Sequence, residues 1–145
     1  MPNSTRYAIH QVFMGLVAGV ASTESADAVN NPALPMGLHG KGPRVLFVLG
    51  RGDELIDQPG AREKRRARLV LGALARTTSA DLDVDALHFA ARIALRGLRA
   101  ALNTAGINGP IVREAQVEPE LKETMSDGAL LLSAYEIEYI ETYPA

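Results

Sequence analysis

The sequence contains no cysteine and three histidines, His10, His39 and His88, which lie far apart along the chain. Without cysteine, a disulfide framework, a thiol nucleophile and a thiolate metal site are all excluded. The spacings of zinc proteases, serine hydrolases and phosphate-binding loops are also missing from the sequence. We therefore predict that the protein is not an enzyme and that it has no catalytic residues, no cofactor and no metal site.

The chain also lacks an excess of charge of either sign. Its 15 Lys and Arg against 17 Asp and Glu give a net charge of −2, so no overall basic field attracts nucleic acid or an anionic membrane. The apolar run at residues 12–21 is too short to span a bilayer, and its helical spacing explains it better than a signal-peptide core does. With 145 residues, 47% of them hydrophobic, we expect one α+β domain over residues 1–145 and no membrane association.

The chain opens with the three- and four-residue apolar spacing of an amphipathic helix, and Asn3 or Ser4 can cap its first turn. Gly15 and Gly19 form a G-x-x-x-G pattern in this helix, which outside a membrane predicts a close contact with the sheet. The residues on the predicted apolar face are Ile9, Val12, Phe13, Leu16 and Val20.

A second, longer helix is predicted from Val84 to Leu102, with Ser79 or Asp81 as its cap and Gly106 as its stop signal. Between the two helices, residues 22–43 are rich in Ser, Asn, Gly and Pro and predict a long loop. Such loops tend to be functional or to order on a partner.

Residues 44–50 form a short apolar run that predicts a central strand, and turns are expected at 50–53 and 58–60. Residues 63–77 alternate with period two and predict a long antiparallel strand, with a helix as the alternative because Arg, Leu and Ala are good helix formers.

A closing hairpin is predicted from strands at 111–124 and 129–143, joined by a tight turn at 126–128. The whole order is helix, long loop, strand, strand, helix, strand, strand. We therefore predict an α+β fold in which an antiparallel four-stranded sheet carries helices packed on one face.

The densest charge cluster in the sequence is basic and lies within residues 62–68. It can be a solvated face or a contact for an acidic partner, and it lacks the interleaved aromatics of single-stranded nucleic-acid binders. Glutamates of the last strand, including Glu136 and Glu138, predict the wet face of a sheet and could complement the basic cluster of an adjacent copy. His88, on an apolar helix face, is interpreted as a structural residue.

The strand–strand–helix–strand–strand order from Pro43 to the end closes with Leu132-Ser-Ala-Tyr-Glu-Ile-Glu-Tyr-Ile-Glu-Thr-Tyr143. In this layout and strand texture the chain resembles the tail terminator proteins of tailed bacteriophages, the minor tail protein U-like family. Related neck and tail-completion proteins share the texture, and no diagnostic motif separates them.

The resemblance implies a structural virion protein of the tail or neck, assembled in the host cytoplasm as a sixfold ring that ends the tail tube. Its partners would be copies of itself, the tail tube protein and the head–tail connector, with DNA passing through the lumen without specific binding. The loops at 22–43 and 50–62 would then reach neighbours, and the basic cluster would meet acidic residues of the next copy. The candidate interface residues are Arg51, Asp53, Arg62, Lys64, Arg65, Arg66, Arg68, Glu136 and Glu138.

Two other classes remain open from the residues alone. A small regulatory or ligand-binding α+β domain would enclose a pocket lined by converging polar groups. A hydrolase or transferase using a glutamate or His88 is disfavoured, because the sequence shows no spacing of a nucleophile and its base.

Overall fold

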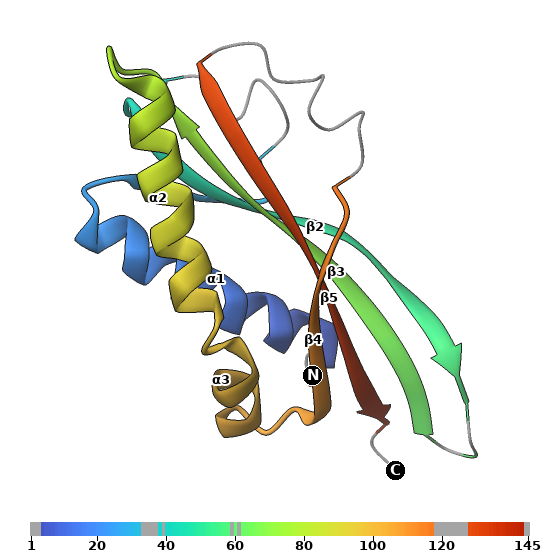
Figure 1. Ribbon diagram of the computed structural model, residues 1–145. Coiled ribbons are helices and arrows are strands. Elements are labelled where there is room, and N and C mark those ends of the chain that lie inside the picture. The colour runs from blue at the N-terminus through green and yellow to red at the C-terminus, as the bar shows by residue number, and fades with distance from the viewer. Residues whose placement is uncertain are drawn as a thin grey trace.

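The computed structural model describes residues 4–32, 38, 40–58, 60, 62–117 and 128–143. In this part of the chain, helices lie against one face of a single five-stranded sheet of order β1-β2-β3-β5-β4, which confirms the mixed α+β prediction (Figure 1). The elements are α1 (Thr5–Thr23), β1 (Asp27–Asn30), β2 (Arg44–Asp57), β3 (Arg62–Ala75), α2 (Ala80–Leu95), α3 (Leu98–Thr104), β4 (Asn108–Ala115) and β5 (Ala129–Thr142).

The prediction of four antiparallel strands is wrong in detail, because the short strand β1 adds to the edge of the sheet. It pairs in parallel with β2, with Asp27 opposite Val45 and Asn30 opposite Val48. β1 lies in the segment predicted to be a loop, and its four residues are too few to show a period-two pattern. Only the returning chain after α1 places them beside β2, so local sequence carried no signal for this strand.

The turn predicted at 50–53 is also wrong, because β2 runs through it to Asp57. The register with β3 shifts between Gly50 and Asp53, and Gly52 has φ of 116°. The glycines therefore mark a β-bulge, which increases the local twist of the strand without ending it. The strand predicted at 63–77 is confirmed as β3, and the helical alternative is wrong.

The long second helix is divided in two, with α2 ending at Leu95 and α3 beginning at Leu98. Gly97 lies at the break, where glycine lowers the stability of a continuous helix. Antiparallel β4 and β5 confirm the closing hairpin, but β4 ends at Ala115 instead of Thr124. In the predicted tight turn, Ser126 and Asp127 lie outside the described residues.

Helix α1 packs on the sheet through an apolar face that is shifted from the predicted one. Ile9 and Phe13 are buried as predicted, but the other buried residues are Val17 and Ala21, whereas Val12, Leu16 and Val20 are only partly buried. Phe13 is fully buried and meets the Tyr135 ring edge-on, with centroids 5.4 Å apart. Ser4 caps the helix by accepting a 3.2 Å hydrogen bond from the Tyr7 amide. The close contact predicted for Gly15 and Gly19 is wrong: both are exposed, and nothing lies within 4 Å of a Cβ built at either position.

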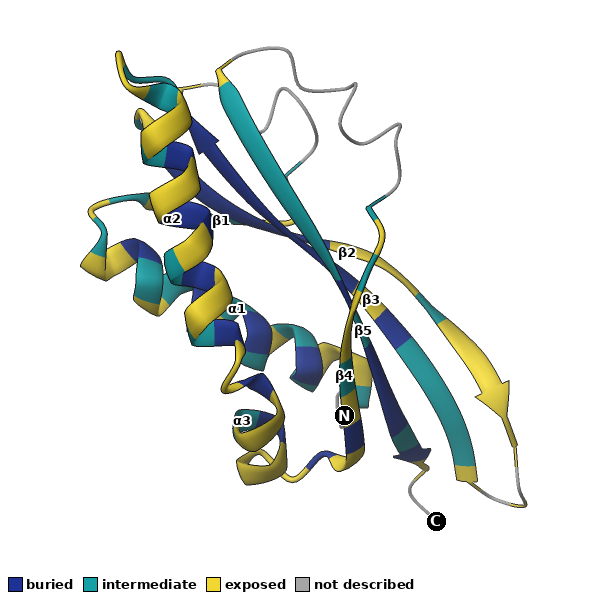
Figure 2. Cartoon of the chain, viewed as in Figure 1, coloured by how far each residue is buried: buried dark blue, intermediate teal, exposed yellow. Residues whose placement is uncertain are grey.

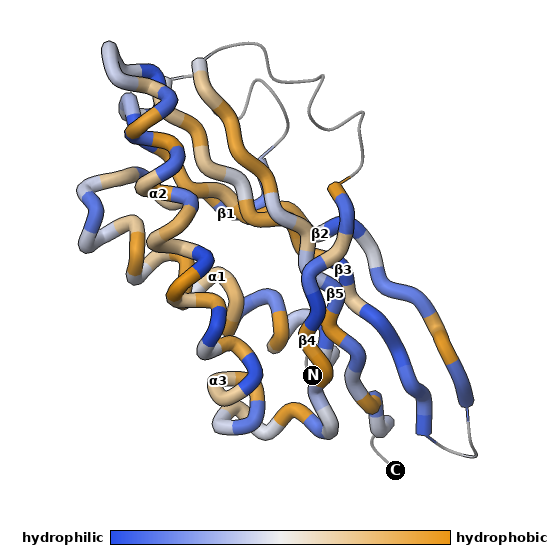
Figure 3. Tube along the Cα trace, in the orientation of Figure 1, coloured by the Kyte–Doolittle hydropathy of each residue, from blue (hydrophilic) through white to orange (hydrophobic). Residues whose placement is uncertain are grey.

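The three long strands divide into two regions, coloured mainly orange and mainly blue by hydropathy in Figure 3. The apolar half comprises residues 44–49 of β2, 69–75 of β3 and 129–135 of β5, which are mostly buried or half-buried (Figure 2). The charged arm comprises residues 50–57, 62–68 and 136–142 of the same strands. Antiparallel registers such as Glu54 opposite Arg66, and Arg66 opposite Glu138, bring the charged stretches together.

Candidate functional site: the charged arm

The face of the charged arm that looks away from the helices carries a network of ion pairs centred on Arg66. Its guanidinium lies 2.9 Å from Glu54, 3.0 Å from Glu138 and 3.4 Å from Glu136. Arg68 adds a 3.2 Å contact with Glu136. Since cross-strand partners of opposite charge stabilise a sheet, this network holds β2, β3 and β5 in register.

Glu138 is the most enclosed member of this network, with 6% of its surface exposed, so the prediction that it lies on the wet face of the sheet is wrong. Lys64 lies 4.0 Å from its carboxylate and Arg113 of β4 lies 3.6 Å away. The hydrogen bond from Arg66, with the nearby cations, lowers the pKa of Glu138 despite its burial. A carboxylate in this setting stays ionised, so it is suited to holding strands together and not to general acid catalysis.

The opposite face of the arm carries a second network built around Asp53. Arg65 donates to Asp53 at 2.6 Å, and the Tyr139 hydroxyl donates to the other oxygen at 2.7 Å. Arg65 also donates to Glu63 at 3.1 Å, and Glu63 accepts from the Tyr143 hydroxyl at 2.7 Å. Burial and the bond to Asp53 raise the pKa of Tyr139, which therefore stays protonated as a donor.

Glu141 joins the arm to the helical layer. Its carboxylate accepts a 3.2 Å hydrogen bond from the Thr5 amide and a second bond from the Thr5 hydroxyl. Thr5 is the first residue of α1, where free backbone N–H groups and the helix dipole favour a negative charge. This contact fixes the start of α1 against the last strand.

The structure places the predicted interface residues on or beside these networks, and most of their charges are paired inside the chain. Lys64, Arg65, Arg66 and Arg68 each have a carboxylate partner within 4.0 Å. Arg51 lies at the bulge and lines a pocket with Arg68 and Glu136, and Arg62 begins β3 at the exposed tip. Contact of these residues with a neighbouring copy stays a prediction.

The arm is close to neutral, which argues against it as a phosphate-binding patch. Its bases are Arg51, Arg62, Lys64, Arg65, Arg66 and Arg68, and its acids are Asp53, Glu54, Asp57, Glu63, Glu136, Glu138 and Glu141. A phosphate-binding surface needs uncompensated cations. Sequence reasoning missed Glu54, Glu63 and Arg113 as members of the networks, and only the cross-strand register could have identified them.

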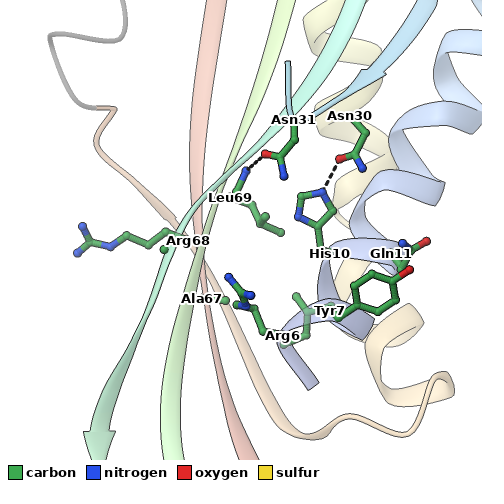
Figure 4. Close-up of a pocket in the computed structure, with 12 residues that line it drawn as sticks. Arg6, Tyr7, His10, Gln11, Asn30, Asn31, Ala67, Arg68 and Leu69 are labelled. Atoms are coloured by element: carbon green, nitrogen blue, oxygen red, sulfur yellow. Dashed lines mark hydrogen bonds between the residues drawn. The ribbon is translucent and has the colours of Figure 1, made fainter. Parts of the chain in front are cut away.

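A separate cavity of about 220 Å³ lies between the start of α1 and the sheet (Figure 4). His10 Nε2 is 2.5 Å from the Asn30 side-chain oxygen, and Asn31 accepts from the Gly50 amide at 2.8 Å. Arg6 also lines the cavity, whereas the Arg68 side chain points away from it in Figure 4. The cavity brings together a few polar groups without a nucleophile beside a base.

Among the described residues, the other side chains considered for catalysis or metal binding have structural roles. His88 is buried and lies 2.8 Å from the Ser133 hydroxyl, and burial lowers its pKa. It is therefore a satisfied core histidine, as its position on an apolar helix face indicated. No group of three metal-ligating side chains occurs in this part of the chain, and none of its helices is long and apolar enough to cross a membrane.

No protein-family model and no curated protein matches the sequence. Among solved structures, the chain is similar to the sheath/tube terminator of PVC, an extracellular contractile injection system, in its extended state seen by cryo-electron microscopy. The TM-score is 0.58 at 10% sequence identity, and the match covers 90% of this chain and 55% of the terminator. The chain thus spans about half the length of that protein. The expected terminator-like fold is confirmed: this chain shares its fold with a sheath/tube terminator.

Proposed function

We propose that the protein is a structural subunit of a tailed phage or phage-like particle, in which a ring of copies ends the tail tube and joins it to the head connector. The observation that carries the proposal is the fold shared with a sheath/tube terminator over 90% of the chain. The sequence-based resemblance to the minor tail protein U-like family supports the same role independently. No catalytic step is part of this function.

The charged arm suits a subunit that must hold its shape at an interface. Ion pairs on both of its faces, such as Arg66 with Glu138 and Arg65 with Asp53, brace strands that extend past the helices. A braced arm loses little conformational freedom on binding, and this preorganisation favours affinity. Because its charges balance, the arm can approach a neighbour or the DNA-bearing lumen without attracting DNA strongly.

The proposed partners are other copies of the chain, in a sixfold ring, together with the tail tube protein and the connector. Native mass spectrometry and negative-stain imaging of the purified chain, with and without tail tubes, test this directly. We expect closed rings, alone or at tube ends, and tubes that stop elongating when the chain is added. A monomer that ignores tube ends and leaves elongation unchanged would contradict the proposal.

The cavity beside His10 favours a second candidate, a small ligand-binding domain. Its volume of about 220 Å³ suits only a small molecule, and Arg6, His10 and Asn31 offer donors to a polar ligand. Thermal shift measurements against a set of small carboxylates and phosphates, repeated with His10→Ala, distinguish the two candidates. Stabilisation that requires His10, in a chain that forms no rings, would favour the ligand-binding domain.

A further inference from the structure

Two exposed surfaces of the molecule combine apolar side chains with unpaired charges of opposite sign among the described residues. One is the outer edge of the charged arm, which we call the acidic edge: residues 53–57 of β2. The other is a groove of about 570 Å³ beside α2, α3 and β4, which we call the basic groove. The groove residues used below are Phe89, Arg92, Ile93, Arg96 and Arg99.

The acidic edge is an unpaired sheet edge among the described residues, because β1 covers β2 only at 45–48. It exposes 48% of Leu55 and 38% of Ile56, both large apolar side chains. Asp57 is exposed beside them and, within the described chain, has no ion-pair partner. An exposed edge with apolar side chains is a template for association with another chain.

The basic groove, like the acidic edge, combines exposed apolar side chains with charged ones, but its charges are positive. Phe89 and Ile93 lie one helical turn apart on α2, with 58% and 54% of their surfaces exposed. Arg96 and Arg99 follow at the groove, and neither has a carboxylate within ion-pair distance in the described part of the chain. Arg92 is 3.4 Å from Glu114, in a pair that is about half exposed. Apolar anchors bordered by unpaired cations mark a surface for an acidic, apolar partner.

We propose that the acidic edge of one copy docks in the basic groove of the next. Leu55 and Ile56 would pack against Phe89 and Ile93, and Asp57 would pair with an arginine of the groove. β2 and β4 lie toward opposite edges of the sheet (Figure 1). The groove is lined in part by β4, so each copy offers an edge on one side and a groove on the other. A contact between two different surfaces propagates head to tail and closes into a ring when its rotation permits.

This inference rests on the proposed ring and adds the surfaces that build it. It also gives the charged arm a more specific use than the sequence suggested. Lys64, Arg65, Arg66 and Arg68 of β3 each have a carboxylate partner within the chain. Among the described residues, Asp57 of the edge and Arg96 and Arg99 of the groove have no ion-pair partner, so they can pair with a neighbour. The neighbouring copy therefore contacts the outer edge of β2 and not the basic cluster of β3.

Complementary variants test the docking. One carries Leu55→Asp with Ile56→Asp, the other Phe89→Asp with Ile93→Asp, and Leu82→Asp is the matched control because Leu82 is 75% exposed on α2 and does not line the groove. We expect each double variant to lose self-association by roughly tenfold or more, whereas the control keeps it. Mixed together, the two double variants retain one intact contact and should form a one-to-one pair and nothing larger.

Because the chain has no cysteine, a single engineered pair gives a second readout. Ile56→Cys with Ile93→Cys should yield oxidised ladders that end in a closed ring, whereas Ile56→Cys with Leu82→Cys should not. Rings that persist in either double variant, or that fail to cross-link, would overturn the docking but leave the terminator function standing. A wild-type chain that stays monomeric even on tail tubes overturns both.

Discussion

The apolar half and the charged arm belong to the same three strands yet are held together by different forces. In the apolar half, side chains such as Phe47, Leu71 and Leu74 are fully removed from water. In the arm, partly exposed residues are joined by ion pairs and hydrogen bonds that individually contribute little. The comparison indicates that burial in the apolar half supplies most of the stability, while the arm is shaped for contact.

The apolar half and the charged arm are expected to contribute differently to folding and to assembly. The helices cover one face of the sheet, and a second apolar cluster containing Phe47 and Leu74 fills the other face of the apolar half. The arm projects beyond the helices with its β2 edge open among the described residues. Changes in the apolar half should therefore alter folding, and changes at the arm edge should alter assembly with little effect on folding.

The largest expected loss of stability comes from removing an aromatic side chain from the apolar half. Phe47→Ala should lower the free energy of unfolding by about 3–5 kcal/mol, because it removes a fully buried ring and leaves a cavity. Leu55→Ala, on the arm of the same strand, should cost less than about 0.5 kcal/mol. Urea denaturation measures both, and equal losses would contradict the division.

Two glycine substitutions test how tightly the apolar half is packed compared with an exposed helix face. A Cβ at Gly72 would overlap the Phe47 ring, so Gly72→Ala should destabilise by about 1–3 kcal/mol through overpacking. Gly15→Ala on the exposed face of α1 meets nothing within 4 Å and should stabilise by about 0.5–1 kcal/mol. Combining Gly72→Ala with Phe47→Leu should recover part of the loss, and no recovery would argue against ring overlap as the cause.

The arm should respond to pH through Glu138. Its pKa is held below the ordinary 4.5 by Arg66, so its contribution to stability is present above that pH and is lost as the pH falls through the lowered value. Glu138→Gln should therefore be less stable than wild type at neutral pH, with the difference shrinking in acid. Denaturation series at several pH values measure the difference, and a constant gap would count against the ion pair.

The smallest expected contribution to stability is that of the ion pair between Arg65 and Asp53. Their side chains are 24% and 14% exposed, so solvent screens the pair only in part. A double-mutant cycle with Arg65→Gln and Asp53→Asn should give a coupling of about 1 kcal/mol or less. A coupling as large as the loss in Phe47→Ala would show that the arm is not the weaker region.

Much of the fold could be predicted because its signals are local. Period-two alternation identified β3, helical spacing identified α1 and α2, and the last strand was placed to within a residue. The interface residues were recognised as charged, but their partners were not, and the predicted exposure of Glu138 was wrong. The sequence does not show whether an arginine pairs with a carboxylate on the adjacent strand or with one on another copy. Both kinds of pair have similar distances once strands or subunits are in contact.

The residue pattern along the chain was enough to identify most of the helices and strands, and the apolar and charged stretches of the long strands, because periodicity and polarity are local properties. The existence and parallel pairing of β1, the bulge at Gly50–Asp53 and the pairing of Arg66 with Glu54 and Glu138 could be seen only in the folded chain. These depend on which segments meet in space, and that is fixed by the register of packed strands and not by any local pattern.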